Sequence, residues 1–139
     1  QFNLTTHRYT DADVRGFIEN GWKIWCISVA DKFGDNGITG AIMITHEGDI
    51  DTFLLSCRIL GKGIEIAFVK TIISLLARDG FDNLTASYLP TAKNAQVNNF
   101  WEKVGFSCTK ENKDGSRYYS LTVKDADVEI KEYYHITVK

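Results

Sequence analysis

A long apolar run followed by two glycines and a helical repeat constrains the fold of this chain most. The run IDTFLLSCRI, residues 50–59, is apolar at both alternating positions in its middle, which is typical of a strand covered on both faces. Gly61 and Gly63 follow it, and apolar residues then recur at three- and four-residue spacing over residues 64–76. The sequence therefore predicts a central strand, a glycine loop and an amphipathic helix that ends at Gly80.

Two interpretations of the glycine loop are open. Glycines let the backbone approach a phosphate closely, and the free N–H groups at a helix amino terminus attract one. Lys62 would add a positive charge. Alternatively, Gly61 and Gly63 do no more than permit a tight turn from strand to helix.

The remaining segments predict an α+β arrangement around a mixed sheet. One further helix is expected to begin with Asp11 as its N-cap, and another, carrying Val97, Phe100, Trp101 and Val104, follows Pro90 and ends at Gly105. Strands are expected at residues 2–9, 22–29, 38–45, 84–89, 106–109 and 118–123. Residues 128–130 and 134–138 are interpreted as short strands or a terminal extension.

Composition narrows the class of protein. The chain has 139 residues, enough for one domain, and its 16 Lys and Arg against 18 Asp and Glu leave no basic surplus for nucleic-acid binding. No segment approaches the about 20 apolar residues that span a bilayer. Cys26, Cys57 and Cys108 lack the spacing of a metal site, so we expect reduced thiols, no metal and a cytoplasmic protein. Because the chain begins at Gln1 and its only methionine is Met43, we expect a domain of a longer chain.

Two motifs in residues 1–123 resemble those of the GNAT acyltransferase superfamily. That family carries a glycine loop, R-G-x-G-x-G/A, and later an N-x-x-A-x-x-x-Y-x-x-x-G-F motif. Gly61, Lys62 and Gly63 occupy the first motif. The second motif is matched in spacing by Asn94, Val97, Trp101, Gly105 and Phe106.

The resemblance implies a GNAT-like fold, with a mixed, mostly antiparallel central sheet flanked by helices, and a site for a pantetheine thioester. In that family the strand before the glycine loop splays from the next strand, and its exposed amides pair with pantetheine. Carried over, the backbone contacts come from Leu55 and Cys57. The phosphate contacts come from Gly61, Lys62, Gly63 and Ile64. Asn94, for which a helix N-cap is the alternative role, and Trp101 complete the cofactor-binding set.

Three positions depart from the family pattern. Leu60 replaces the basic residue before the first glycine, although Arg58 offers a match in a shifted register. Glu65 replaces a small residue and should repel a dianionic pyrophosphate. Trp101 replaces a tyrosine that often protonates the departing thiolate, and an indole N–H cannot act as a useful acid.

Within the superfamily, IDTFLLSCRILGKGIE and PTAKNAQVNNFWEKVGF are similar to the carboxy-terminal domain of FkbH-like proteins. Those proteins carry an amino-terminal phosphatase domain of the haloacid dehalogenase type, which is the expected neighbour in the full chain. The resemblance implies a phosphopantetheine cofactor on an acyl carrier protein, or else acetyl-CoA or another acyl-CoA. Because carrier proteins are acidic, we expect docking onto Lys62, Lys93 and Lys103.

Two candidate catalytic residues lie on the central strand. Cys57 would accept the acyl group if its thiol pKa were lowered, with a buried inert cysteine as the alternative. Asp51 forms a proton-handling cluster with His46, Glu47 and Asp49, or else belongs to a solvated turn. Three functions remain open: acyl transfer from a pantetheine thioester to a thiol or amine, a catalytically silent module that docks a carrier protein, and acetyl-CoA-dependent N-acetylation of an amine.

Overall fold

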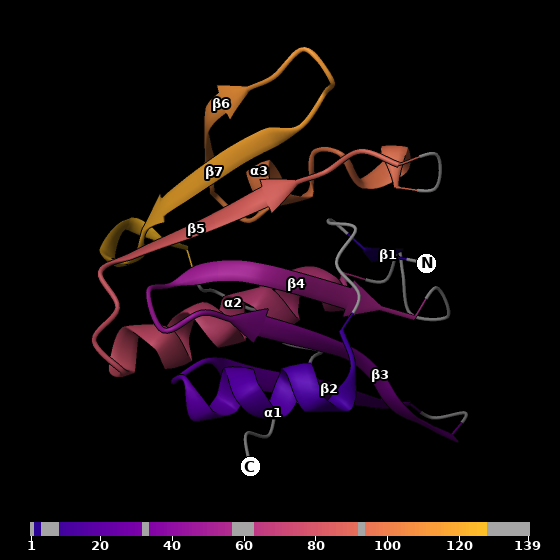
Figure 1. Cartoon of the computed structure of the whole chain (residues 1–139). Helices are drawn as coiled ribbons and strands as arrows, with labels where there is room; N and C mark the ends of the chain where they lie inside the picture. The colour runs from indigo at the N-terminus through magenta and orange to yellow at the C-terminus, as the bar shows by residue number, and fades with distance from the viewer. Residues whose placement is uncertain (1, 4–8, 32–33, 57–62, 92–93, 128–139) are drawn as a thin grey trace.

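A single mixed sheet forms the centre of the molecule (Figure 1). The computed structural model describes residues 2–3, 9–31, 34–56, 63–91 and 94–127. Seven strands lie in the order β2-β3-β4-β5-β7-β6, with β1 paired to β4. Every strand pair is antiparallel except β4 and β5, so the expected mixed, mostly antiparallel α+β sheet is confirmed. The strands are β1 (Phe2–Asn3), β2 (Lys23–Asp31), β3 (Gly34–Ile44), β4 (Asp49–Leu55), β5 (Asn83–Tyr88), β6 (Ser107–Glu111) and β7 (Arg117–Thr122).

Helices cover both faces of the sheet (Figure 1). On one face, Phe53 of β4 contacts Phe68 of α2 (Ile64–Arg78) and Phe100 of α3 (Phe100–Lys103), with ring centroids 5.7 and 5.5 Å away. The other face carries α1 (Asp11–Glu19). Short 3-10 turns, η2 (Ala95–Val97) and η3 (Val123–Asp125), complete the described chain.

The helix α2 supplies most of the helical side of the core. Its apolar stripe is buried against the sheet, as the spacing predicted. The buried members are Ala67, Phe68, Val69, Ile72, Ile73 and Leu76. The helix ends at Arg78, and Gly80 follows with φ of 91°, a left-handed conformation that favours glycine.

Thr10, and not Asp11, is the N-cap of α1. The Thr10 hydroxyl accepts a hydrogen bond from the Asp13 backbone N–H at 3.2 Å, and the Asp13 carboxylate accepts one from the Thr10 N–H at 2.9 Å. This reciprocal pair is a capping box, which satisfies donors that the helix start leaves free. The predicted cap was therefore one residue late. No side chain of α1 is fully buried, and Phe17 anchors the helix by stacking on Trp22 with ring centroids 3.9 Å apart.

Other predicted boundaries also change. The single helix expected before Gly105 is two short segments, η2 and α3, with Asn98 and Asn99 between them. Asparagine side chains compete for backbone hydrogen bonds and lower helix propensity, which accounts for the break. The strand predicted for residues 2–9 is described only at Phe2–Asn3, and Tyr9 lies outside any strand. The central strand ends at Leu55, while residues 57–62 and 128–139 lie outside the described part of the chain.

Candidate functional site

The two parallel strands at the centre of the sheet pair at one end only. β4 and β5 are joined at Asp49 with Thr85 and at Ile50 with Ala86. Beyond these pairs β4 runs on to Leu55 and β5 to Tyr88 without pairing to each other. The carboxyl ends of the strands therefore diverge, as Figure 1 shows, and the backbone edge of β4 is separated from β5 there. We term this separation of the two strand ends the opening.

A β-bulge in β4 lies where the strands begin to diverge. Ile44 of β3 pairs with Ile50, but Met43 pairs with Thr52, so Asp51 is an extra residue on β4. Ile50 and Phe53 are both buried. They pair with Ile44 and Ile42, which share one face of β3, so the inserted residue is turned toward the opposite face, where α1 lies.

Two hydroxyl groups hold the Asp51 carboxylate on this face. The Tyr9 hydroxyl and the Thr52 hydroxyl each donate to Asp51 Oδ2 at 2.8 Å. Burial, reinforced by the hydrogen bond to Asp51, raises the pKa of Tyr9 to about 12. The Tyr9 proton therefore stays in place over the whole physiological pH range, and the carboxylate has a fixed position from which it can accept a proton.

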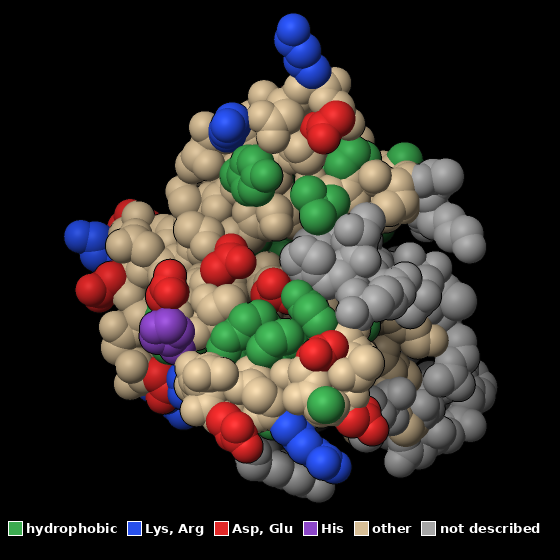
Figure 2. Space-filling model, in the orientation of Figure 1, with side chains coloured by type: hydrophobic (Ala, Val, Ile, Leu, Met, Phe, Trp, Pro, Cys, Tyr) green, Lys and Arg blue, Asp and Glu red, His purple; other side chains and the backbone are tan. Residues whose placement is uncertain are grey.

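The surface around α1 has acidic character. Figure 2 shows apolar side chains at the centre of this view of the molecule, bordered by Asp and Glu side chains. Asp51 is half-buried, and Asp13 adds to the negative potential around Tyr9. A positively charged or amine-bearing group would be attracted to such a surface.

Leu55 presents its backbone to the divergent edge of β4. The Ser56 N–H donates to Thr39 O of β3 at 2.7 Å. Because backbone groups of successive strand residues point to opposite edges, the N–H and C=O of Leu55 face away from β3. These groups face the edge where β1 lies, and the pantetheine contact predicted for Leu55 stays a prediction.

The amino terminus of α2 begins at Gly63. Gly63 adopts φ of 78° and ψ of 0°, a left-handed conformation that favours glycine, and Ile64 is the first helical residue. In the first turn, the Oε2 atom of Glu65 is buried and has no hydrogen-bond partner within the described ranges. The other predicted loop residues, Cys57, Gly61 and Lys62, lie outside the described residues, as do Arg58 and Leu60.

Asn94 fastens the end of β5 to the loop that follows it. Its side chain is 2% exposed. Oδ1 accepts from the Tyr88 hydroxyl at 3.0 Å and from the Thr91 N–H at 2.7 Å, while Nδ2 donates to Leu89 O at 2.8 Å. Asn94 stands at the N-cap position of η2, as the alternative role predicted, but its side chain makes no capping bond to that turn.

Trp101 belongs to the aromatic core. It is 2% exposed, and its Nε1–H donates to Ser87 O of β5 at 3.1 Å. Its ring contacts Phe53, Phe100 and Phe106. The indole N–H thus stabilises the end of β5, and its one hydrogen-bond donor is used in that contact.

His46 and Glu47 lie in the polar turn before β4, and Asp49 begins that strand. His46 Nε2 and Glu47 Oε1 lie 3.8 Å apart on the surface, while Asp49 accepts from the Thr85 hydroxyl at 2.7 Å. His46 and Glu47 thus have the exposure of a solvated turn. Within the described ranges, no group of three or more His, Cys, Asp or Glu residues is placed to hold a metal ion.

Other predicted surface features are only partly described. Cys26 and Cys108 are free and exposed, and Lys103 is exposed on α3, whereas Lys93 lies outside the described residues. Among the helices that the structure describes, none combines the length and apolar character needed to cross a membrane.

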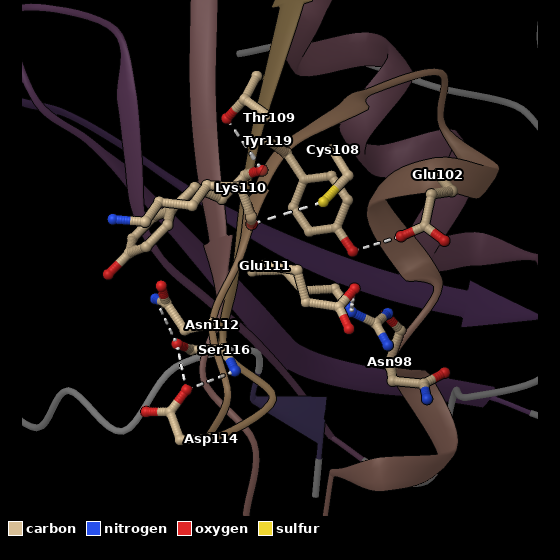
Figure 3. Close-up of polar contacts among 12 residues, drawn as sticks. Asn98, Glu102, Cys108, Thr109, Lys110, Glu111, Asn112, Asp114, Ser116 and Tyr119 are labelled. Atoms are coloured by element: carbon tan, nitrogen blue, oxygen red, sulfur yellow. Dashed lines mark hydrogen bonds and ion pairs between the residues drawn. The ribbon is translucent and has the colours of Figure 1, made fainter.

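A polar network ties the β6–β7 hairpin to α3 (Figure 3). The Tyr119 hydroxyl donates to Glu102 of α3. Arg117 donates through Nη1 to Asn98 O at 3.0 Å and forms an ion pair with Glu111 at 3.3 Å. Burial and the bond to Glu102 raise the pKa of Tyr119 to about 12. The Tyr119 bond thus holds α3 against the β6–β7 hairpin.

Sequence reasoning missed Tyr9 and Gly40 as parts of the site. A Cβ atom at Gly40 would lie 2.5 Å from Leu55 Cδ2 and 2.7 Å from Leu54 O, so β3 and β4 approach closely at the end of the opening. The signal for Gly40 was a glycine inside the β-rich run ITGAIMIT. Tyr9 carried no comparable signal, because its partner lies 42 residues away.

Comparison with known proteins identifies the fold. No protein-family model matches the sequence, and no curated protein is significantly similar to it. Solved structures do match. A domain from Methanocaldococcus jannaschii is 15% identical over 86% of this chain and 79% of that chain, with a TM-score of 0.63.

Two further similar structures are acetyltransferases. The ribosomal-protein-S18-alanine N-acetyltransferase from Escherichia coli is 11% identical over 94% of this chain and 85% of its own, with a TM-score of 0.62. A GNAT family acetyltransferase from Elizabethkingia anophelis with acetyl-CoA bound is 10% identical over 81% and 83%, with a TM-score of 0.60. The divergent strands and these similarities together show that the chain has the fold of the GNAT acetyltransferases.

Proposed function

We propose that this chain is an acyltransferase domain that binds a pantetheine thioester between the diverging ends of β4 and β5. The observation that carries the proposal is the bulge at Asp51 beside the end of the β4–β5 pairing. It sets a carboxylate on the α1 face, and it precedes a backbone edge, at Leu55, that points into the opening. The similar Elizabethkingia protein, which has acetyl-CoA bound, supports the assignment.

The proposed reaction is transfer of an acyl group to an amine or a thiol. The acceptor attacks the thioester carbonyl carbon, a C–N or C–S bond forms, and the bond to the pantetheine sulfur breaks. Asp51 takes the proton from the acceptor, and the thiolate leaves and is protonated by solvent. Backbone amides and the fixed orientation of the two substrates supply the remaining catalysis. The acidic surface around α1 favours an amine acceptor.

The negative charge of Glu65 at the start of α2 bears on whether coenzyme A or a carrier protein holds the pantetheine. A buried carboxylate oxygen of Glu65, without a partner in the described chain, lies in the helix turn nearest to where the GNAT fold holds phosphate. Coenzyme A brings a pyrophosphate to that turn, whereas a carrier protein brings one phosphate. We therefore infer a phosphopantetheine arm on an acyl carrier protein as the ligand. The resemblance to FkbH-like proteins supports this choice, and it also favours a phosphatase domain of the haloacid dehalogenase type before this chain.

One alternative has specific support, and two others make distinct predictions. A silent carrier-docking module is favoured by Trp101, which stands at the position of the usual acid with its N–H bound to Ser87 O. An acyl-enzyme route through Cys57 would be abolished by Cys57→Ser, whereas direct transfer would survive that change. Simple amine N-acetylation would require good affinity for acetyl-CoA.

Calorimetric titration separates these functions. We expect the domain to bind a phosphopantetheinylated acyl carrier protein and to have little affinity for acetyl-CoA. Glu65→Gln, which removes the charge and keeps the shape, should tighten acetyl-CoA binding about tenfold. Glu65→Asp keeps the charge and is the matched control.

Each outcome has a clear meaning. Tight acetyl-CoA binding by the native chain would favour an ordinary N-acetyltransferase. Carrier binding without acyl transfer would favour the docking module. Binding of neither ligand would contradict the proposed function.

A further inference from the structure

The edge of β4 that faces the opening is occupied by the amino-terminal strand. β3 pairs with Leu55 and Leu54 through Gly40 and Ala41. β1 pairs with the same two residues through Phe2 and Asn3. A strand has two edges, so β1 takes the edge on the β5 side, and Figure 1 shows it in the space between the ends of β4 and β5.

The alternation of backbone groups identifies the atoms involved. The Ser56 N–H is bound to Thr39 O, so Leu55 directs its N–H and C=O to the β1 side. Leu55 pairs there with Phe2. In an antiparallel pair of this kind the two residues exchange both backbone hydrogen bonds. The backbone of Phe2 therefore uses the same groups of Leu55 that an extended ligand would need.

We propose that β1 is an exchangeable occupant of this edge, which the pantetheine arm must displace in order to bind. The inference rests on the proposed function, because it names the competitor for that same site. Pantetheine is an extended chain with amide groups and can add to a sheet edge as a peptide strand does. The described part of β1 pairs over two residues, whereas β3 pairs with β4 over five, so β1 is the more easily removed neighbour.

Such competition lowers the apparent affinity of the site for its ligand. If β1 occupies the edge nine-tenths of the time, the apparent affinity for the ligand is about tenfold lower than the intrinsic affinity. Any contact that draws β1 away would raise the affinity by up to the same factor. The amino-terminal strand would then regulate access to the opening.

Three substitutions in the 139-residue chain test this inference. Phe2→Pro removes the N–H that faces Leu55 and so breaks the pairing. Phe2→Ala changes the side chain and keeps that N–H. Asn3→Pro removes an N–H that points away from β4, and a following proline favours the extended conformation that Phe2 already has.

Two measurements are made on the native chain and on each variant. One is hydrogen exchange of the Leu55 amide, followed by NMR, and the other is the affinity for phosphopantetheine. We expect slow Leu55 exchange in the native chain and in both controls. Phe2→Pro alone should exchange at least about tenfold faster and bind phosphopantetheine about tenfold more tightly.

The failures are distinguishable. Fast Leu55 exchange in the native chain, or faster exchange in Phe2→Pro without any gain in affinity, would overturn the inference and leave the proposed function standing if phosphopantetheine still binds. Absence of binding in every variant would overturn both.

Discussion

At the scale of single residues, the Asp51 carboxylate carries the chemical proposal. The bulge turns it away from the core, and the hydroxyls of Tyr9 and Thr52 hold one of its oxygens at 2.8 Å. A base held in this way needs no reorganisation when the acceptor arrives, which is the condition for effective general-base catalysis.

Asp51→Asn should therefore lower the rate of acyl transfer by about 10²- to 10⁴-fold while ligand affinity is unchanged. The substitution keeps the shape and the hydrogen-bonding oxygen but removes the ability to accept a proton. Single-turnover transfer and calorimetry measure the two quantities separately. Asp49→Asn, two residues earlier on the same strand, is the matched control. Equal rates for Asp51→Asn and the native chain would exclude Asp51 as the base.

At the scale of elements, β3 and β4 approach closely beside the end of β4 that diverges from β5. A side chain at Gly40 would collide with Leu54 O, a backbone atom that cannot move aside alone. At Gly16 of α1, in contrast, a Cβ atom would meet no heavy atom within 4 Å. The two glycines are present for different reasons, and the same substitution distinguishes them.

Gly40→Ala should destabilise the fold by about 1–3 kcal/mol, because the two strands must separate to admit the methyl group. Gly16→Ala should instead stabilise it by about 0.5–1 kcal/mol, since alanine loses less backbone entropy in a helix. Chemical denaturation measures both changes. A stable Gly40→Ala variant would show that β3 and β4 are less closely packed than the structure indicates.

Elements with a strong local pattern were predictable from the sequence. The spacing of apolar residues predicted α2 and its end before Gly80, and the run at 50–59 predicted a central strand. The helix before Gly105 was predicted too long, because two adjacent asparagines outweigh the apolar spacing around them. The candidate base, Asp51, was named from the sequence.

The partners of that residue were not predictable. The bulge depends on the register between β3 and β4. Both segments are rich in apolar residues, so their sequences are compatible with more than one register. The bond from Tyr9 joins residues 42 positions apart, and no local pattern encodes such a contact. Sequence reasoning therefore located the strand of the candidate base but not the geometry of the site.

At the scale of the whole molecule, Tyr9 and Tyr119 make the stability of the fold depend on pH in the alkaline range. The pKa of Tyr9 and of Tyr119 is raised to about 12 by burial and by hydrogen bonds to Asp51 and Glu102. The unfolded chain loses these protons near pH 10, while the folded chain keeps them until about pH 12. The stabilisation is thus complete below pH 10 and is lost as the pH rises from 10 to 12.

Denaturation measured over pH 8–12 should show this loss, and Tyr119→Phe should reduce the slope between pH 10 and pH 12. The same reduction is expected for Tyr9→Phe. Tyr118→Phe, at an exposed position on the same strand as Tyr119, keeps Tyr9 and Tyr119 and is the control. An unchanged slope in both test variants would contradict the assignment.

The parallel pairing of β4 with β5, which covers only two residue pairs, also has a consequence for how the chain folds. β2, β3 and β4 are neighbours both in sequence and in the sheet, and β5, β6 and β7 form a second antiparallel set within residues 83–122. Each set can assemble from contacts between residues that are near in sequence. The parallel pairing of β4 with β5 joins residues separated by α2, so it forms only after that crossover helix is in place. The chain should therefore fold as two halves that meet last at Ile50 and Ala86, so the opening forms in the final step.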